Sequence, residues 1–194
     1  GVAAMSAHPD LQPDDAKAMI AYVLSLDEGE DDGEGGLVTN LSDIPAGKWL
    51  SPEAVKEQDL TPGLRVKLFQ LDKAPNTFAD ISFAGKPTLE GAMGQVEANY
   101  DGFGEFKNNF ALQAEGYLYL EKDDNILLTL ASDDGSRLFL DGQLLINHDG
   151  WHGSTPKEAE VALRAGYHPI RVEYFQAGGG RGLSLQWTRS GSPE

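Results

Sequence analysis

The chain has 194 residues, 40% of them hydrophobic, and a formal net charge of −16. This charge repels phosphate backbones and anionic lipid, so we expect no nucleic-acid partner and favour cationic ones. No run approaches the roughly 18 apolar residues of a membrane span, so no membrane insertion is expected. The absence of cysteine excludes disulfides, thiolate catalysis, Cys-ligated zinc and covalent haem attachment within this chain.

The first 60 residues are expected to lie outside the main domain. Residues 9–26 place Ala16, Met19, Ile20, Val23 and Leu24 at helical spacing, which predicts one amphipathic helix. Residues 27–40 open with acidic and glycine residues that cannot bury surface, and they are interpreted as a solvated linker. Residues 41–60 form a connecting segment, with a short helix predicted at 51–55 because Ser and Pro suit its first positions.

From about residue 61 the apolar period changes to two. Leu64, Val66 and Leu68 alternate with basic residues, and residues 170–174 and 183–187 alternate in the same way. Alternation with one polar face is typical of antiparallel sheets. Glycine-bearing turns follow one another at short intervals, so the fold class predicted for residues 61–190 is mainly β, an antiparallel β-sandwich.

Several ordered motifs within this region resemble one family. They are Gly-Tyr at 116–117, Ser-Asp-Asp-Gly at 132–135, Asp-Gly at 141–142, Ala-Gly-Tyr-His at 165–168, Tyr-Phe at 174–175 and Leu-x-Leu-x-Trp at 183–187. In this order they resemble the anthrax-protective-antigen-type (PA-fourteen) domain over residues 61–189. The resemblance implies a jelly-roll sandwich that serves as an accessory module of toxins, glycosidases and adhesins. In sugar-binding members, a cis peptide joins two adjacent aspartates that hold one calcium ion, and the ion coordinates two sugar hydroxyls.

The N-terminal residues resemble a second family. Met5, a loop and a helix ending in Tyr-Val-Leu-Ser-Leu are similar to the end of a small c-type cytochrome, in which such a methionine binds haem. The haem-attachment motif is absent, so Met5 and His8 are expected to bind nothing here. An unrelated amphipathic helix is the alternative interpretation.

Asp133 and Asp134 are the candidate metal ligands. Successive side chains of an extended strand point to opposite faces, so directing both carboxylates at one ion requires unusual backbone and brings like charges together. A divalent cation offsets this repulsion, and calcium, which takes six to eight oxygen ligands, is the expected ion. The alternative is an ordinary turn, because Asp-Asp-Gly is also a good turn sequence.

The loop at residues 176–182 is expected to form the second half of the site. Gly178, Gly179 and Gly180 leave their carbonyl oxygens free to turn inward, and they are predicted to complete the metal shell, together with the side-chain oxygen of Gln176. Family adhesins use a loop asparagine, and residues 176–182 contain no Asn or Asp. Weak or lost calcium binding is therefore the alternative.

Two further side chains are candidate sugar contacts. Arg181 could reach a hydroxyl or an acidic group of a glycan, or it could be an ordinary loop charge. Trp151 could offer its ring face to sugar C–H groups, or it could pack beneath its loop. His148 and His152 lie four residues apart without a helix to align them, so zinc is not predicted.

The sequence predicts a calcium-dependent, lectin-like carbohydrate-binding module that is not an enzyme. A glycosidase needs two carboxylates about 5–9.5 Å apart, whereas two aspartates sharing one ion are consumed as ligands. The partner is expected to be a glycan bound through vicinal hydroxyls. The module is expected to be monomeric, within a larger exported protein of periplasmic or cell-surface location. A structural or protein-interaction sandwich without metal or sugar is the alternative.

Overall fold

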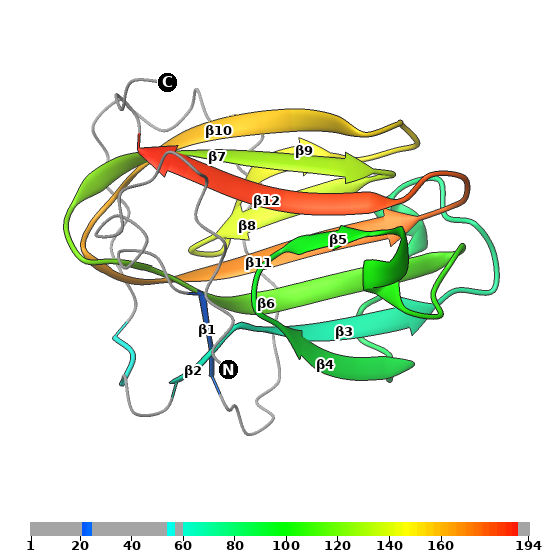
Figure 1. Cartoon of the computed structure of the whole chain (residues 1–194), viewed down its shortest axis with the longest axis horizontal. Coiled ribbons are helices and arrows are strands. Elements are labelled where there is room, and N and C mark those ends of the chain that lie inside the picture. Colours follow the sequence, from blue (N-terminus) through cyan, green and yellow to red (C-terminus); the bar gives the residue numbers. More distant parts are fainter. Residues whose placement is uncertain (1–20, 25–53, 57–59, 190–194) are drawn as a thin grey trace.

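Two antiparallel sheets pack against each other, which confirms the mainly-β fold (Figure 1). The computed structural model describes residues 21–24, 54–56 and 60–189. The larger sheet has the order β2-β1-β6-β11-β8-β9, and β3 and β4 extend it beside β6; the smaller sheet has the order β10-β7-β12-β5. No helix among the described residues is long and apolar enough to cross a membrane.

The strands have the following bounds. The larger sheet contains β1 (Ala21–Leu24), β2 (Leu60–Pro62), β3 (Leu64–Gln70), β4 (Leu89–Met93), β6 (Phe110–Leu120), β8 (Ser136–Leu140), β9 (Gln143–His148) and β11 (Gly166–Gln176). The smaller sheet contains β5 (Glu97–Asn99), β7 (Asp124–Asp133), β10 (Thr155–Leu163) and β12 (Gly182–Arg189). Two 3-10 helices, η3 (Phe78–Asp80) and η4 (Tyr100–Phe103), lie in the connections.

The main core lies between the sheets, where the alternation of each strand directs its apolar residues. β7 contributes Ile126, Leu128 and Leu130, and β8 contributes Leu138 and Leu140, all at most 1% exposed. Burial of this apolar surface, at about 25 cal/mol per Å², is the main force holding the layers together.

A second apolar cluster covers the outer face of the larger sheet at one end. Phe69, Phe78, Ala111 and Phe175 form it, and partly buried residues of the β3–β4 connection pack against it. Both faces of β6 are therefore buried over residues 110–114, and the outer-face residue Gln113 is only 8% exposed.

The helix expected over residues 9–26 is wrong where the structure describes it. Residues 21–24 form β1, which pairs with β2 and, through Ala21 and Tyr22, with Leu118 and Tyr117 of β6. β3 pairs with β6 only as far as Glu115, so the next stretch of the β6 edge is open to another strand. The sequence Ala-Tyr-Val-Leu of β1 contains good strand formers and can occupy this edge. Residues 54–56 have no regular structure, and the rest of both predicted helices, the linker, Met5, His8 and the cytochrome resemblance lie outside the described residues.

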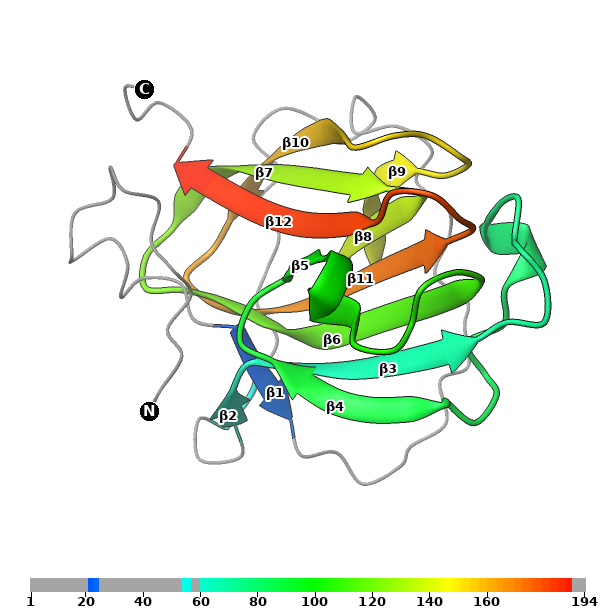
Figure 2. The ribbon, with the colours of Figure 1, turned by 45° about the vertical axis from the view of Figure 1, so that its right-hand side comes forward.

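One end of the sandwich gathers the loops that carry the predicted site. The ends of β3, β7 and β11 and the start of β12 lie together at the right of Figure 1, and the connection carrying η3 borders them in the turned view of Figure 2. The Asp133–Asp134 turn and the loop at residues 176–182 therefore meet at one end of the molecule.

Candidate functional site

Asp133 and Asp134 lie where β7 turns into β8. Asp133 is the last residue of β7, and its register partner on β12 is Gly182. The peptide bond between the two aspartates is cis, as in the geometry that the family resemblance implied. Asp134 is only 6% exposed, whereas Asp133 is partly exposed.

Gly135 allows the turn to press against the second apolar cluster. Its carbonyl accepts a hydrogen bond from the Phe175 N–H (2.9 Å), and a Cβ atom at this position would lie 2.3 Å from the Phe175 ring. Beside the turn, the buried hydroxyls of Ser132 and Ser136 are hydrogen-bonded at 2.7 Å. The turn is thus fixed by backbone and side-chain contacts on its inner side.

The loop at residues 176–182 lies beside the aspartate turn. The Ala177 N–H donates to Oδ2 of Asp134 at 3.0 Å, so the loop contacts one of the two carboxylates directly. Gly178 and Gly179 are exposed, and Gly179 has a φ of 86°, which favours glycine. Gln176 is completely buried, and its amide nitrogen donates to the Gly180 carbonyl at 2.6 Å.

A third wall comes from the β9–β10 connection, residues 149–154. The Ser154 backbone N–H hydrogen-bonds to the Asp133 carboxylate. Trp151 is 62% exposed, and its indole N–H donates to the Pro75 carbonyl at 2.6 Å. Its ring is thus held by its polar edge and does not pack beneath the loop.

Electrostatics make this corner favourable for a cation. Burial and the neighbouring Asp134 raise the pKa of Asp133, although His152 and the Ser154 N–H lower it. Two adjacent carboxylates with a disfavoured negative charge gain from a bound positive ion. Among the described residues no group of three or more Asp, Glu or His side chains converges on one point, so further ligands have to be neutral oxygens or water. This donor set suits calcium, which accepts carbonyl and water oxygens in flexible geometry.

Three contributors to the site were missed by the sequence analysis. Ser154 acts through its backbone, which leaves no sequence signal. Asn99 ends β5, and its side-chain oxygen lies 2.9 Å from where a Cβ on Gly182 would stand. Tyr174 is fully buried and donates from its hydroxyl to the Asp133 carbonyl at 2.6 Å. Its inward position was readable from the alternation of β11, but its partner depends on how the strands pair.

The remaining candidates take peripheral places. Arg181 lies partly buried at the entrance to β12. The rings of His148 and His152 stack with centroids 3.7 Å apart, and burial, followed by the proximity of His152, lowers the pKa of His148 to about 4. The two rings are nearly parallel, at 11°.

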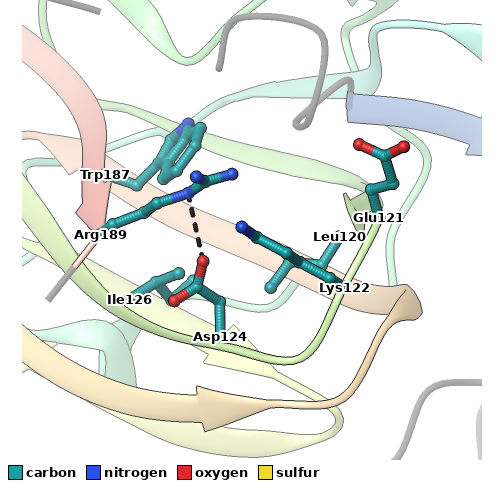
Figure 3. Close-up of a pocket in the computed structure, with 7 residues that line it drawn as sticks. All are labelled: Leu120, Glu121, Lys122, Asp124, Ile126, Trp187 and Arg189. Atoms are coloured by element: carbon teal, nitrogen blue, oxygen red, sulfur yellow. Dashed lines mark ion pairs between the residues drawn. The ribbon is translucent and has the colours of Figure 1, made fainter. Parts of the chain in front are cut away.

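A small hollow lies at the opposite end of β7. Its lining includes Trp187, Lys122 and Glu121, with an ion pair of 3.1 Å between Arg189 and Asp124 (Figure 3). Asp124 and Asp133 are separated by the whole length of β7, about 30 Å at 3.3 Å per residue. The hollow therefore belongs to a different part of the surface from the aspartate pair.

Comparisons with known proteins bear on the family and the fold. The PA14 domain family profile matches residues 78–194, and no curated protein matches the chain. Among solved structures, a PA14 sugar-binding domain from an RTX adhesin is 16% identical, with a TM-score of 0.58, and the match covers 68% of this chain and 92% of that one. The epithelial adhesin 9 A domain from Candida glabrata, in complex with Galb1-3GlcNAc, is 13% identical, with a TM-score of 0.58 and coverage of 76% and 91%.

A third similar structure is an anti-sigma factor domain-containing protein, 20% identical, with a TM-score of 0.54 over 66% of this chain. The chain spans 43% of that protein. At these identities the similarity shows the fold alone.

Proposed function

The chain belongs to the PA14 domain family, and from this premise we propose that it is a calcium-dependent, non-catalytic carbohydrate-binding module of an exported protein. The carboxylates of Asp133 and Asp134 hold the ion, and carbonyl oxygens of Gly178, Gly179 and Gly180 complete the protein side of its shell. A bound calcium ion supplies open coordination positions for two neighbouring sugar hydroxyls.

The observation that carries this proposal is the meeting of two loops at one carboxylate. Asp134 is nearly buried, and its side chain accepts a hydrogen bond from the Ala177 N–H of the glycine loop. A turn with no further purpose has no need for a second carboxylate beside it, because like charges disfavour the arrangement. A divalent cation between this pair and the neighbouring carbonyls removes that repulsion.

The exposed indole of Trp151 fits the sugar side of the proposal. Its N–H is held by Pro75, and its own loop also carries Ser154, which contacts Asp133. The ring is thus fixed on the wall of the calcium corner, where it can meet the apolar face of a sugar. Arg181 borders the same corner on the loop side and can donate to sugar oxygens.

The proposal is tested by calorimetric titration of calcium, followed by a panel of monosaccharides with and without chelator. Asp134→Asn keeps an oxygen for the Ala177 N–H but removes the charge, so it should abolish calcium and sugar binding together. Glu121→Gln, at an exposed carboxylate that lines the hollow at the opposite end of β7, removes the same charge and should bind both normally. Trp151→Ala should weaken sugar binding while calcium affinity stays unchanged, and Trp151→Phe should retain part of the sugar affinity.

Sugar binding that persists in chelator would contradict the role of calcium. A chain that binds neither calcium nor any sugar would instead support the alternative, a structural or protein-interaction sandwich. In that case the melting temperature should also be the same in calcium and in chelator. A ligand present at 100 times its Kd stabilises the folded state by about 2.7 kcal/mol, so a real calcium site shifts unfolding measurably.

A further inference from the structure

A buried chain of hydrogen bonds joins the two halves of the site from behind. The Tyr174 hydroxyl lies 2.6 Å from the Asp133 carbonyl and 2.6 Å from Oε1 of Gln176, two acceptors that share its single hydrogen. The Gln176 amide nitrogen donates to the Gly180 carbonyl at 2.6 Å, and the Gly182 backbone also hydrogen-bonds to the Tyr174 oxygen. The aspartate turn, the glycine loop and the start of β12 therefore share one buried polar link.

The members of this link have little freedom to move. Tyr174 and Gln176 are both 0% exposed. The Tyr174 ring is stacked on Phe103, with centroids 5.3 Å apart and 13° between the ring planes, and Phe110 packs against its edge at 5.8 Å. Burial, followed by the charges of Asp134 and Asp133, raises the pKa of Tyr174, so its hydroxyl keeps the proton that it donates.

Chemistry fixes the orientation of the Gln176 amide. The Gly180 carbonyl can only accept a hydrogen bond, so the atom facing it has to be the amide nitrogen. The amide oxygen then faces the Tyr174 hydroxyl, on the interior side. Gln176 consequently presents no free oxygen to the aspartate pair, unlike the side-chain ligand that the sequence analysis expected at this position.

We propose that Tyr174 and Gln176 are positioning residues, which set the distance between the Asp133 main chain and the Gly180 carbonyl and so preform the calcium site. Gln176 is thus not a metal ligand. This inference rests on the calcium role proposed above. Partners that orient metal ligands commonly change metal affinity by 10–100-fold when they are substituted.

The variant Gln176→Glu separates the two roles of this residue. A carboxylate is a better calcium ligand than an amide, so a ligand role predicts tighter binding in this variant. A positioning role predicts the opposite, because the new carboxylate has no hydrogen to donate to Gly180 and pushes that carbonyl away. Tyr174→Phe keeps the stacked ring and removes only the hydroxyl.

The experiment titrates the full chain and both variants with calcium, and it measures amide hydrogen exchange of Gly182 in chelator. Tyr174→Phe and Gln176→Glu should each weaken calcium binding 10–100-fold. Exchange at Gly182 should accelerate in Tyr174→Phe, because that amide loses its acceptor. Tyr119→Phe, at the far end of β6, should change neither measurement.

Equal or tighter calcium binding by Gln176→Glu overturns the positioning role, as does unchanged Gly182 exchange in Tyr174→Phe. A wild-type chain that binds no calcium refutes the proposed function instead. The exchange measurement in chelator still decides whether the buried link holds the loop.

Discussion

Replacement of Gly135 by alanine tests how tightly the aspartate turn is packed. The new Cβ would lie 2.3 Å from one atom of the Phe175 ring and 2.6 Å from the next, whereas ordinary contacts lie at 3.4–4 Å. The ring has to retreat by about 1 Å, but it is 0% exposed and packs edge-on against Phe78 at 5.0 Å. Overpacking of this kind costs about 1–3 kcal/mol.

Alanine also has fewer backbone conformations than glycine in the unfolded chain, and this difference stabilises the folded state by about 0.4–1 kcal/mol. We therefore expect Gly135→Ala to lower the free energy of unfolding by about 1–2 kcal/mol. For a domain of this size the melting temperature should fall by about 4–8 °C.

Chemical denaturation in chelator measures this change without a contribution from calcium. Gly153→Ala is the matched control, because no atom lies within 4 Å of its added Cβ and its φ needs no glycine. Phe175→Leu replaces the ring that obstructs the new methyl group with a smaller side chain. The double variant with Gly135→Ala should therefore lose less free energy of unfolding than the sum of the two single variants, with a coupling energy of about 0.5–3 kcal/mol. A Gly135→Ala protein within 0.5 kcal/mol of wild type would refute the packing argument.

Two further predictions concern buried charges of β11. His168 is 0% exposed, and its ring nitrogens face the Asp141 carboxylate and the Arg164 carbonyl, each at 2.8 Å. Burial opposes protonation of the ring, but the two acceptors outweigh this effect and raise the pKa of His168. The stability that the protonated ring adds should be complete below about pH 6.5 and lost as the pH rises through the raised pKa. An NMR spectrum of the ring that shows one neutral tautomer at pH 6.5 would contradict this prediction. Glu173, with a side chain 5% exposed, pairs with Arg137 and Arg171, which are 26% and 33% exposed. Glu173→Ala should therefore cost about 1.5–3 kcal/mol in denaturant unfolding, and a loss below 0.5 kcal/mol would show that these pairs are dispensable.

The family motifs pointed to a candidate metal site that composition alone did not favour. Asp133, Asp134 and the glycine loop were named from the sequence, and the structure brings them together at one end of the sandwich. Composition alone favoured a plain turn, because Asp-Asp-Gly suits both. The ordered motifs favoured the metal site, because the family resemblance implies which loops follow which strands.

The role of Gln176 could not be read in the same way. A glutamine before three glycines suits a metal shell as well as a buried hydrogen bond. Only the pairing of β11 with its neighbours places its amide between Tyr174 and Gly180. The direction of a side chain at the end of a strand depends on what packs behind it, and its immediate neighbours in sequence do not specify that.

The N-terminal segment shows the same limit in secondary structure. Helical spacing of apolar residues predicted a helix, yet residues 21–24 add a strand to the open edge of β6. Hydrogen bonds to an existing edge outweigh a weak local preference when the segment is short.

The sequence by itself determined the β-sandwich and the two loops of the candidate site, because alternation, turn glycines and adjacent acids are local properties of the chain. The tertiary structure alone decided that Ser154 contacts Asp133, that Asn99 stands beside Gly182, and that Tyr174 links both walls. These contacts join residues between 21 and 83 positions apart. Their geometry is fixed by strand register and by the packing of one sheet on the other, and neither is written in any single stretch of sequence.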